Sequence, residues 1–320
     1  MAVDERIASM SKLTKIELSK LPRNIMYAED GNTFMMTMNR ACTSANMQGN
    51  KAAFEAWALF ARTHGYSRVV LSESDCTRTL SAAEKLHYHR FLYRAYRFEK
   101  GFDWFTLSGD LMKKAENFEN TELSREDLFV NAPIIEAATK TESPEAKMER
   151  LLVKDEYLDY LNSLFRLNLP KYYNQLPVGL FGGCVTSKTA IFPRSHAAID
   201  IWGLDESTFH FIELKVKKNQ NLGILSEVFF YACYIHDMYC RKRLAQNKDL
   251  EYERKYPVKL RGYNELINAN ADNVVAHILT QQKHPRLDAA FAELQGCRLD
   301  GIRFADAVSY SLKELGMVTE

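Results

Sequence analysis

Two carboxylates and one ammonium group occur in a segment that otherwise has the composition of a protein core. They belong to Asp200, Glu213 and Lys215, and apolar residues flank each of them. Two carboxylates held close together repel each other unless a cation joins them, and such hard oxygen ligands suit Mg²⁺ or Mn²⁺. The backbone carbonyl of Leu214 would add another oxygen ligand. An ammonium group beside them can orient a water molecule or stabilise charge on a phosphate oxygen. These residue types predict metal-assisted hydrolysis of a phosphodiester.

Two strands joined by a short turn would bring these groups together. Residues 197–204 and 208–216 have the composition of strands, and the polar Asp-Glu-Ser between them fits a hairpin turn. Residues two apart in a strand share a face, so Glu213 and Lys215 point one way while Ile212, Leu214 and Val216 point toward a core. If the turn sets the register, Asp200 lies opposite them. We expect one buried face and one face that carries the hydrolysis site. The sequence leaves open an exposed sheet edge with a cross-strand ion pair.

The surrounding segments predict an α/β fold with a central mixed sheet flanked by helices. Ser143-Pro144 is a good helix start, with a capping hydroxyl followed by proline in the first turn. The expected helices cover residues 145–165, 222–246 and 286–295, and the expected strands cover 177–185, 197–204, 208–216, 273–281 and 302–311.

The N-terminal part is expected to be an additional mixed α/β region. Residues 50–66 and 81–105 have the apolar spacing of helices, and 67–72 is a strand candidate. We place a domain boundary near residue 135, which divides the chain into 1–135 and 136–320. The role of the first region is left open among substrate contacts, a partner surface and a dimer interface.

Asp200 followed by Glu213-Leu214-Lys215 resembles the D-(x)n-(D/E)-x-K signature of the PD-(D/E)xK nuclease superfamily. The resemblance covers roughly residues 145 to 310, and Ile199 stands where the motif name has proline. It implies a restriction-endonuclease-like fold and hydrolysis of nucleic acid, with DNA expected rather than RNA. It also implies that Asp200 and Glu213 hold Mg²⁺ or Mn²⁺ and that Lys215 assists the attacking water.

The same resemblance implies additional site residues on the flanking helices. An acidic residue on the helix before the strands would be Glu149 or Glu156, and Glu149 is preferred because it lies nearer the helix start. Glu227 and Tyr231, four residues apart on one helical face, stand where RecB-like nucleases have Q-x-x-x-Y, with Glu in place of Gln. For the glutamates the alternative is a solvated helix charge, and for Tyr231 it is a place in the core.

Contacts with nucleic acid are expected from groups near the predicted site. The candidates are His196, Lys217, Lys218 and Tyr231. The formal net charge of the 320-residue chain is only +1, so attraction to phosphates must come from locally basic surfaces.

The sequence argues against a structural zinc site, a secretory signal and a membrane span. The six scattered cysteines form no CxxC pair of the kind that binds zinc, and the N-terminus has no apolar signal core. No apolar run approaches the roughly 18 residues of a membrane span. We therefore expect a cytoplasmic protein without membrane contact, and a homodimer would suit cutting of both strands. The alternative function is a catalytically inactive nucleic-acid-binding or scaffold protein that retains the fold.

Overall fold

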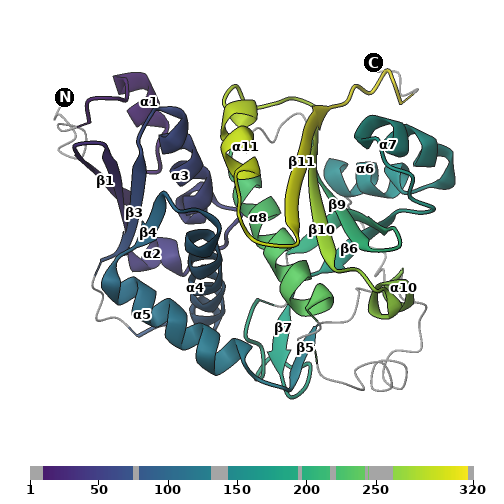
Figure 1. Ribbon diagram of the computed structural model, residues 1–320, viewed down its shortest axis with the longest axis horizontal. Helices are drawn as coiled ribbons and strands as arrows, with labels where there is room; N and C mark the ends of the chain where they lie inside the picture. The colour runs from purple at the N-terminus through teal and green to yellow at the C-terminus, as the bar shows by residue number, and fades with distance from the viewer. Residues whose placement is uncertain are drawn as a thin grey trace. The chain divides into compact units, whose positions relative to one another are not determined.

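The computed structural model shows two compact α/β units (Figure 1). It describes residues 10–74, 79–130, 143–193, 197–216, 221–241, 244 and 262–315. Unit 1 comprises Met1–Ser124, Asn221–Glu227 and Arg286–Leu299, and unit 2 comprises Arg125–Gln220, Val228–Pro285 and Asp300–Glu320. Each unit has a mixed sheet with helices packed on it, which confirms the predicted α/β class.

This division differs from the contiguous one expected in the sequence. Two segments from the second half of the chain group with unit 1, and residue 135 itself lies outside the described residues. The reason is visible in α11 (Leu287–Gln295), which packs on α3 (Phe54–Thr63). Arg62 of α3 donates from Nε to Glu293 of α11 at 3.3 Å. Such contacts between residues far apart in the chain leave no local mark in the sequence.

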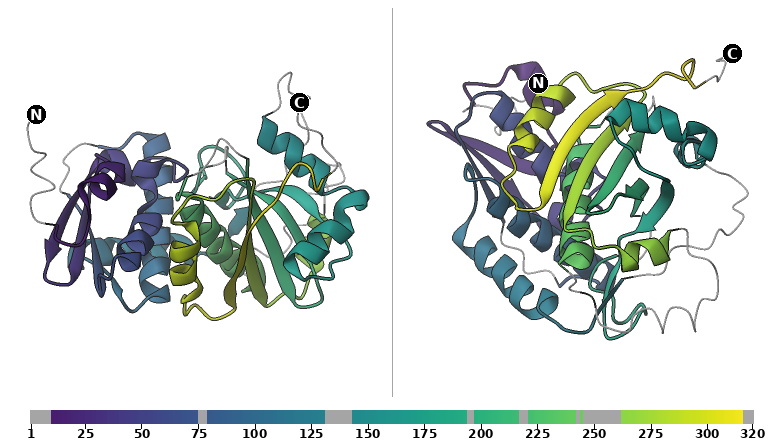
Figure 2. Two further views of the ribbon diagram at one scale, coloured as in Figure 1. Left: turned by 90° about the horizontal axis from the view of Figure 1, so that it is seen from above. Right: turned by 45° about the vertical axis from the view of Figure 1, so that its right-hand side comes forward.

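Unit 1 is built on a four-stranded sheet in the order β1-β2-β3-β4. Strands β1 and β2 are antiparallel, whereas β2–β3 and β3–β4 are parallel. Alternation along β2 buries Phe34, Met36 and Met38 and leaves Met35 exposed, as expected for a sheet with one covered face. Helices α3 and α4 lie against the covered face (Figure 2). The strands are Ile25–Asp30, Thr33–Met38, Arg68–Glu73 and Phe105–Leu107.

The helices of unit 1 start where the sequence supplies caps. Ser81 accepts from the backbone N–H of Glu84 and Glu84 accepts from that of Ser81, a capping box that begins α4. Where a helix was predicted over 50–66, the chain forms a 3₁₀ turn followed by the shorter helix α3. The predicted strand 67–72 corresponds to β3, and the predicted helix 81–105 corresponds to α4. Strands β1 and β2 were not predicted. The other helices are α1 (Lys15–Lys20), α2 (Arg40–Thr43), α4 (Ala82–Gly101) and α5 (Gly109–Phe118), followed by a π-helical turn at Glu119–Leu123.

Unit 2 is built on a five-stranded mixed sheet in the order β11-β10-β9-β8-β6. Strand β10 is parallel to both β9 and β11, whereas β9, β8 and β6 form an antiparallel meander. A separate two-stranded sheet pairs β5 (Leu128–Val130) with β7 (Leu180–Gly182). The five strands are β6 (Tyr173–Pro177), β8 (Ala198–Leu204), β9 (Thr208–Lys215), β10 (Asn273–Thr280) and β11 (Ile302–Ser309).

Helices cover both faces of the unit 2 sheet. Met148 and Leu152 of α6 (Pro144–Leu152) and Leu161 of α7 (Leu158–Phe165) form a core with Ile212 and Leu214 of β9. On the opposite face the ring of Tyr231, from α8 (Ile224–Ile235), meets that of Phe211 with centroids 6.3 Å apart. Figure 1 shows α6 and α7 on one side of the sheet and α8 on the other.

Two predicted elements of unit 2 are wrong in their bounds. The first strand of the meander is β6, not 177–185, and only its last residue falls in the predicted range; β7 lies in that range but belongs to the small sheet. The predicted helix over 145–165 is two helices, because a 3₁₀ turn at Asp155–Tyr157 separates α6 from α7. The structure confirms the other predicted strands and the helix 286–295, and it confirms the helix 222–246 over α8 and the π-helical turn His236–Cys240. The confirmed strands are 197–204, 208–216, 273–281 and 302–311.

Within the described ranges, no helix is long and apolar enough to cross a membrane.

Candidate active site

The hairpin of β8 and β9 sets the register of the three charged residues. Asp205 holds the turn, because its Oδ1 accepts from the backbone N–H groups of Ser207 (3.1 Å) and Thr208 (2.8 Å). The two strands pair from Leu204–Phe209 to Ile201–Ile212. One residue further in this register, Asp200 stands opposite Glu213. Because directly opposite residues share a face, Asp200, Glu213 and Lys215 project from the same face, as the sequence predicted.

Asp200 lies where the regular pairing of β8 and β9 ends. Its Oδ2 accepts from the backbone N–H of Leu214 at 2.8 Å, so a side-chain oxygen takes the place of a strand carbonyl. The N–H and C=O of one residue project to the same edge of a strand. The Leu214 carbonyl therefore lies on the edge of β9 that faces Asp200, which is the position required of the predicted backbone ligand.

Lys215 joins two carboxylates from different elements. Its Nζ donates to Oε1 of Glu213 at 2.7 Å and to Oε1 of Glu145, in the first turn of α6, at 3.1 Å. Glu213 is 1% exposed and Lys215 is 7% exposed. Charge pairs in such surroundings are screened much less than surface pairs, so these contacts hold the ammonium group firmly in place.

Glu149 of α6 brings a further carboxyl group to this point. It is buried one turn after Glu145, and the side-chain amide of Gln175 donates to its Oε2. Burial, followed by the negative charge of Asp200, raises the pKa of Glu149 to about 8. We call Asp200, Glu213, Glu145 and Glu149 the carboxylate cluster.

Gln175 owes its position to an irregularity in β6. Strand β6 pairs with β8 at Asn174–Ile201 and at Leu176–Ile199, and Gln175 is the residue between, opposite Asp200. Its φ is +59°, in the left-handed region that non-glycine residues rarely adopt. Strain of this kind costs on the order of 1–3 kcal/mol and is concentrated at functional sites. The chain holds Gln175 there with its amide on Glu149.

Both faces of the sheet are buried, whereas the sequence predicted one buried face and one face that carries the hydrolysis site. Every residue of β9 after Thr208 is buried, because α8 covers the face that carries the cluster. The least buried acidic group is Glu145, whose side chain is 26% exposed. The cluster therefore lies where β8 and β9 part, next to the first turns of α6, and Glu145 is its most exposed carboxylate. The alternative of an exposed sheet edge is excluded for the same reason.

Of the remaining predicted residues, one is exposed, two are buried away from the cluster, and three lie outside the described residues. Glu156 is exposed in the 3₁₀ turn and pairs with Lys154 at 3.6 Å, so Glu149 is the helix acid of the cluster. Tyr231 is fully buried beside Phe211, which corrects its predicted contact with nucleic acid. Glu227 is buried in the first turn of α8, which groups with unit 1 rather than with the cluster. His196, Lys217 and Lys218 lie outside the described residues.

Comparisons with protein-family models, with curated proteins and with solved structures find no match to this chain.

The cluster offers oxygen ligands of the kind that a divalent cation prefers. Within the described residues, no three side chains of His, Cys, Asp or Glu form a group that could hold a metal ion. The predicted ligand set needs only two, Asp200 and Glu213, together with the Leu214 carbonyl. Burial is the main cause of the raised pKa of Glu149, and the negative charge of Asp200 adds to it; a bound cation would offset this second effect. These oxygen donors are of the kind that Mg²⁺ and Mn²⁺ prefer.

Three residues of the site were not predicted. Glu145 lies four residues before Glu149, so helical spacing would have indicated that both acids share one face. Tyr310, directly after β11, lies near enough to Glu145 that its charge, added to burial, raises the pKa of the phenol to about 12. Gln175 has no such signal, because its role depends on a backbone conformation that the sequence YNQLP does not indicate.

Proposed function

We propose that unit 2 is a metal-dependent nuclease that hydrolyses phosphodiester bonds, with DNA as the preferred substrate. The observation that carries this proposal is the carboxylate cluster. Asp200 and Glu213 stand opposite each other where two strands part, with the Lys215 ammonium fixed on the same face. This is the arrangement that the resemblance to PD-(D/E)xK nucleases implies for the three residues.

Each residue of the site has a chemical role in this proposal. Asp200, Glu213 and the Leu214 carbonyl would hold Mg²⁺ or Mn²⁺, which when bound supplies an acidified water and charge stabilisation at the phosphate. Lys215, oriented by Glu213 and Glu145, positions the attacking water and stabilises negative charge on a phosphate oxygen. Glu149, whose pKa is near 8, can hold a proton at neutral pH and release it in the course of the reaction.

A cleavage assay tests the proposal directly. The purified chain is incubated with end-labelled single-stranded DNA, double-stranded DNA and RNA, with Mg²⁺, with Mn²⁺ or with EDTA. We expect cleavage that requires the metal and that Lys215→Ala lowers by about 10²–10³-fold, as for loss of one charge-stabilising group. Lys154→Ala is the matched control, since Lys154 is an exposed lysine of unit 2 with its own glutamate partner. Absence of cleavage on all three substrates would overturn the proposal, and so would an unchanged rate for Lys215→Ala.

Metal binding gives a readout that does not depend on activity. For the cleavage assay, circular dichroism must show that Lys215→Ala is folded, because Lys215 contacts two carboxylates in a buried setting. Asp200→Asn keeps the side-chain shape and removes one negative charge. Calorimetric titration with Mn²⁺ should show binding to the wild type and at least tenfold weaker binding to Asp200→Asn. Equal affinity of the two proteins would remove Asp200 from the ligand set.

A second candidate is a nucleic-acid-binding or scaffold protein without catalysis. The observation in its favour is the deep burial of Glu213 and Lys215, whose charged groups are directed to each other. Gel-shift measurements distinguish the two candidates. Binding of DNA that persists in EDTA, with no product formed in Mg²⁺ or Mn²⁺, would support the second candidate.

A further inference from the structure

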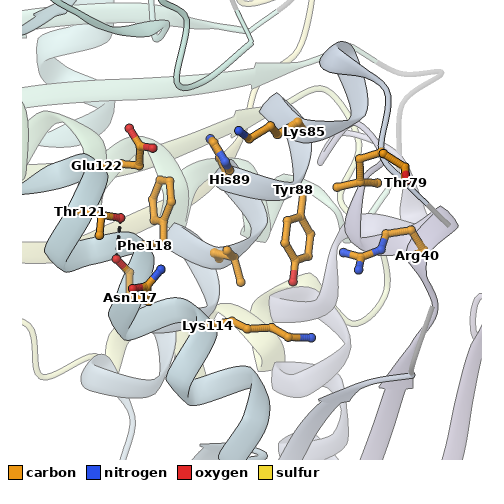
Figure 3. Close-up of a pocket in the computed structure, with 12 residues that line it drawn as sticks. Arg40, Thr79, Lys85, Tyr88, His89, Lys114, Asn117, Phe118, Thr121 and Glu122 are labelled. Atoms are coloured by element: carbon orange, nitrogen blue, oxygen red, sulfur yellow. Dashed lines mark hydrogen bonds between the residues drawn. The ribbon is translucent and has the colours of Figure 1, made fainter. Parts of the chain in front are cut away.

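Unit 1 contains a pocket that the proposed nuclease function does not use. It has a volume of about 560 Å³, within the usual range for small-molecule sites. Its walls come from the start of α2, from residues 79–80 and α4, and from α5 with the π-helical turn after it, and the close-up in Figure 3 shows side chains that line it. All lining residues belong to unit 1. We call it the unit 1 pocket.

Three basic side chains, those of Arg40, Lys85 and Lys114, line the unit 1 pocket. Figure 3 shows Arg40 and Lys114 near the hydroxyl end of Tyr88, and Lys85 apart from them with its ammonium group toward His89. Lys114 is 45% exposed through its side chain, so its ammonium group can reach a ligand from solvent. In the part of the chain that the structure describes, Lys85 makes no ion pair. It therefore brings a charge that no carboxylate neutralises.

The buried carboxylate of Glu73 fixes two of these cations, Arg40 and Lys114, in place. Glu73, at the end of β3, accepts from Tyr88 Oη at 2.9 Å and from Lys114 Nζ at 3.1 Å, and it pairs with Arg40 at 3.0 Å. The Arg40 guanidinium also lies 4.5 Å from the centroid of the Tyr88 ring. With Glu122 in the lining, three cations face two carboxylates, and the site retains a positive balance. Donors held in this way bind an anion without a large loss of side-chain entropy.

Part of the lining of the unit 1 pocket is apolar and aromatic. Leu80, Leu92 and Phe118 line it, and the ring of His89 lies 5.0 Å from that of Phe118. Asn117 and Thr121 add a polar edge, where the Thr121 hydroxyl donates to the Asn117 carbonyl at 2.7 Å. A wall of rings beside a cluster of cations suits a ligand that is flat and apolar at one end and anionic at the other.

From this combination we propose that the unit 1 pocket binds a nucleoside monophosphate, either free or as the 5′-phosphorylated end of a strand. The phosphate lies at Arg40, Lys85 and Lys114, and the base lies against Phe118, His89 and Leu92. This inference stands apart from the proposed nuclease activity, because none of these residues belongs to the carboxylate cluster.

Calorimetric titration of the full chain with AMP tests the inference. We expect saturable binding below about 1 mM, and about tenfold weaker binding for Lys85→Gln and for Lys114→Gln, each of which loses one charged contact to the phosphate. Lys113→Gln is the matched control, since Lys113 is an exposed neighbour on the same helix that does not line the pocket. Both lysines of the pocket are at least partly exposed, so their replacement should leave the fold intact. No saturable binding of AMP, or an equal effect of the Lys113 change, would overturn the inference.

Fragments of the ligand separate its two parts. Adenosine, ribose 5-phosphate and inorganic phosphate should each bind at least tenfold more weakly than AMP. Adenosine as tight as AMP would refute the phosphate site, and ribose 5-phosphate as tight as AMP would refute the base site. An oligonucleotide with a 5′-phosphate that competes with AMP, while its 5′-hydroxyl counterpart does not, would support a strand end as the source. Competition by neither would support the free nucleotide.

Discussion

At the scale of single residues, Glu149 is the group whose surroundings alter its chemistry most clearly. Its pKa is about 8 in the folded chain, against 4.5 for an unperturbed glutamate. Between these two pH values the folded chain keeps a proton that the unfolded chain releases. The free energy of unfolding therefore falls as pH rises through this window, by at most about 1.4 kcal/mol per pH unit. Below pH 4.5 and above pH 8 the contribution of Glu149 is constant.

Replacement of Glu149 by glutamine should remove that part of the pH dependence. Glutamine cannot ionise, so we expect Glu149→Gln to be more stable than the wild type at pH 8, by at least about 1 kcal/mol, and nearly equal to it at pH 4.5. Urea denaturation at both pH values measures the difference. Glu156→Gln, which changes an exposed glutamate, should behave as the wild type does. A Glu149→Gln effect of the same size at both pH values would show that Glu149 is not the titrating group.

The backbone of Arg166 provides a second test at this scale. Arg166 follows α7 with φ +56° and ψ +43°, and the N–H of Leu167 donates to the carbonyl of Asn162 at 2.8 Å, as in a Schellman motif. Glycine adopts this conformation without the steric cost that a Cβ atom imposes. Arg166→Gly should therefore raise the free energy of unfolding by about 0.5–1 kcal/mol.

The control for Arg166→Gly is Arg166→Ala. Alanine also removes the guanidinium group, whose charge acts on Asp306, but it keeps the Cβ atom. A gain in urea denaturation that appears with alanine as well as glycine would assign the effect to the lost charge rather than to the backbone.

At the scale of elements, the packing of α3 on α4 includes a buried ion pair. Glu55 of α3 is fully buried and accepts from Arg94 of α4, at 2.7 Å from the guanidinium Nε. Burial raises the pKa of Glu55, and the charge of Arg94 opposes that rise. Arg94 also donates to the Ala52 carbonyl at 3.0 Å, so it joins three points of unit 1. Loss of one partner would leave the other charge buried without compensation.

Single and double replacement of this pair should have very different costs. We expect Arg94→Met to lower the free energy of unfolding by about 3–5 kcal/mol, because the Glu55 carboxyl remains in an apolar setting. In the double variant Glu55→Leu with Arg94→Met, most of that loss should be recovered, since two apolar side chains of similar size fill the same space. Urea denaturation of the four proteins forms the cycle. A double variant as unstable as Arg94→Met would show that the Ala52 contact, not the ion pair, is the important one.

The elements that position the site were predictable to different degrees. Strands β8 and β9 follow from their apolar composition and from the Asp-Glu-Ser turn, and a side-chain period of two then places Glu213 and Lys215 on one face. Strand β6 could not be predicted from the sequence, because Asn174, Gln175 and Pro177 are poor strand residues and Gln175 interrupts the pairing with β8. The burial of both sheet faces could not be predicted either. It depends on α8 packing over Phe211, a contact between segments whose distance apart the sequence does not specify.

At the scale of the whole molecule, a formal net charge of +1 gives no general attraction to nucleic acid. Any affinity for phosphate must arise from local groups, and the described residues offer two such places in different units. Lys215 lies in the carboxylate cluster of unit 2, and Arg40, Lys85 and Lys114 lie in the unit 1 pocket. The two sites share no residue, and each has its own buried carboxylate partner for its cations.

Substitutions in the two sites should therefore act independently. We expect Asp200→Asn to leave the affinity for AMP unchanged within about twofold, and Lys85→Gln to leave metal-dependent cleavage unchanged within the same limit, as for sites with no shared partners. The double variant should show both single effects at full size. Calorimetry with AMP and the cleavage assay, run on all four proteins, measure this. A loss of AMP affinity in Asp200→Asn would mean that the two units are coupled.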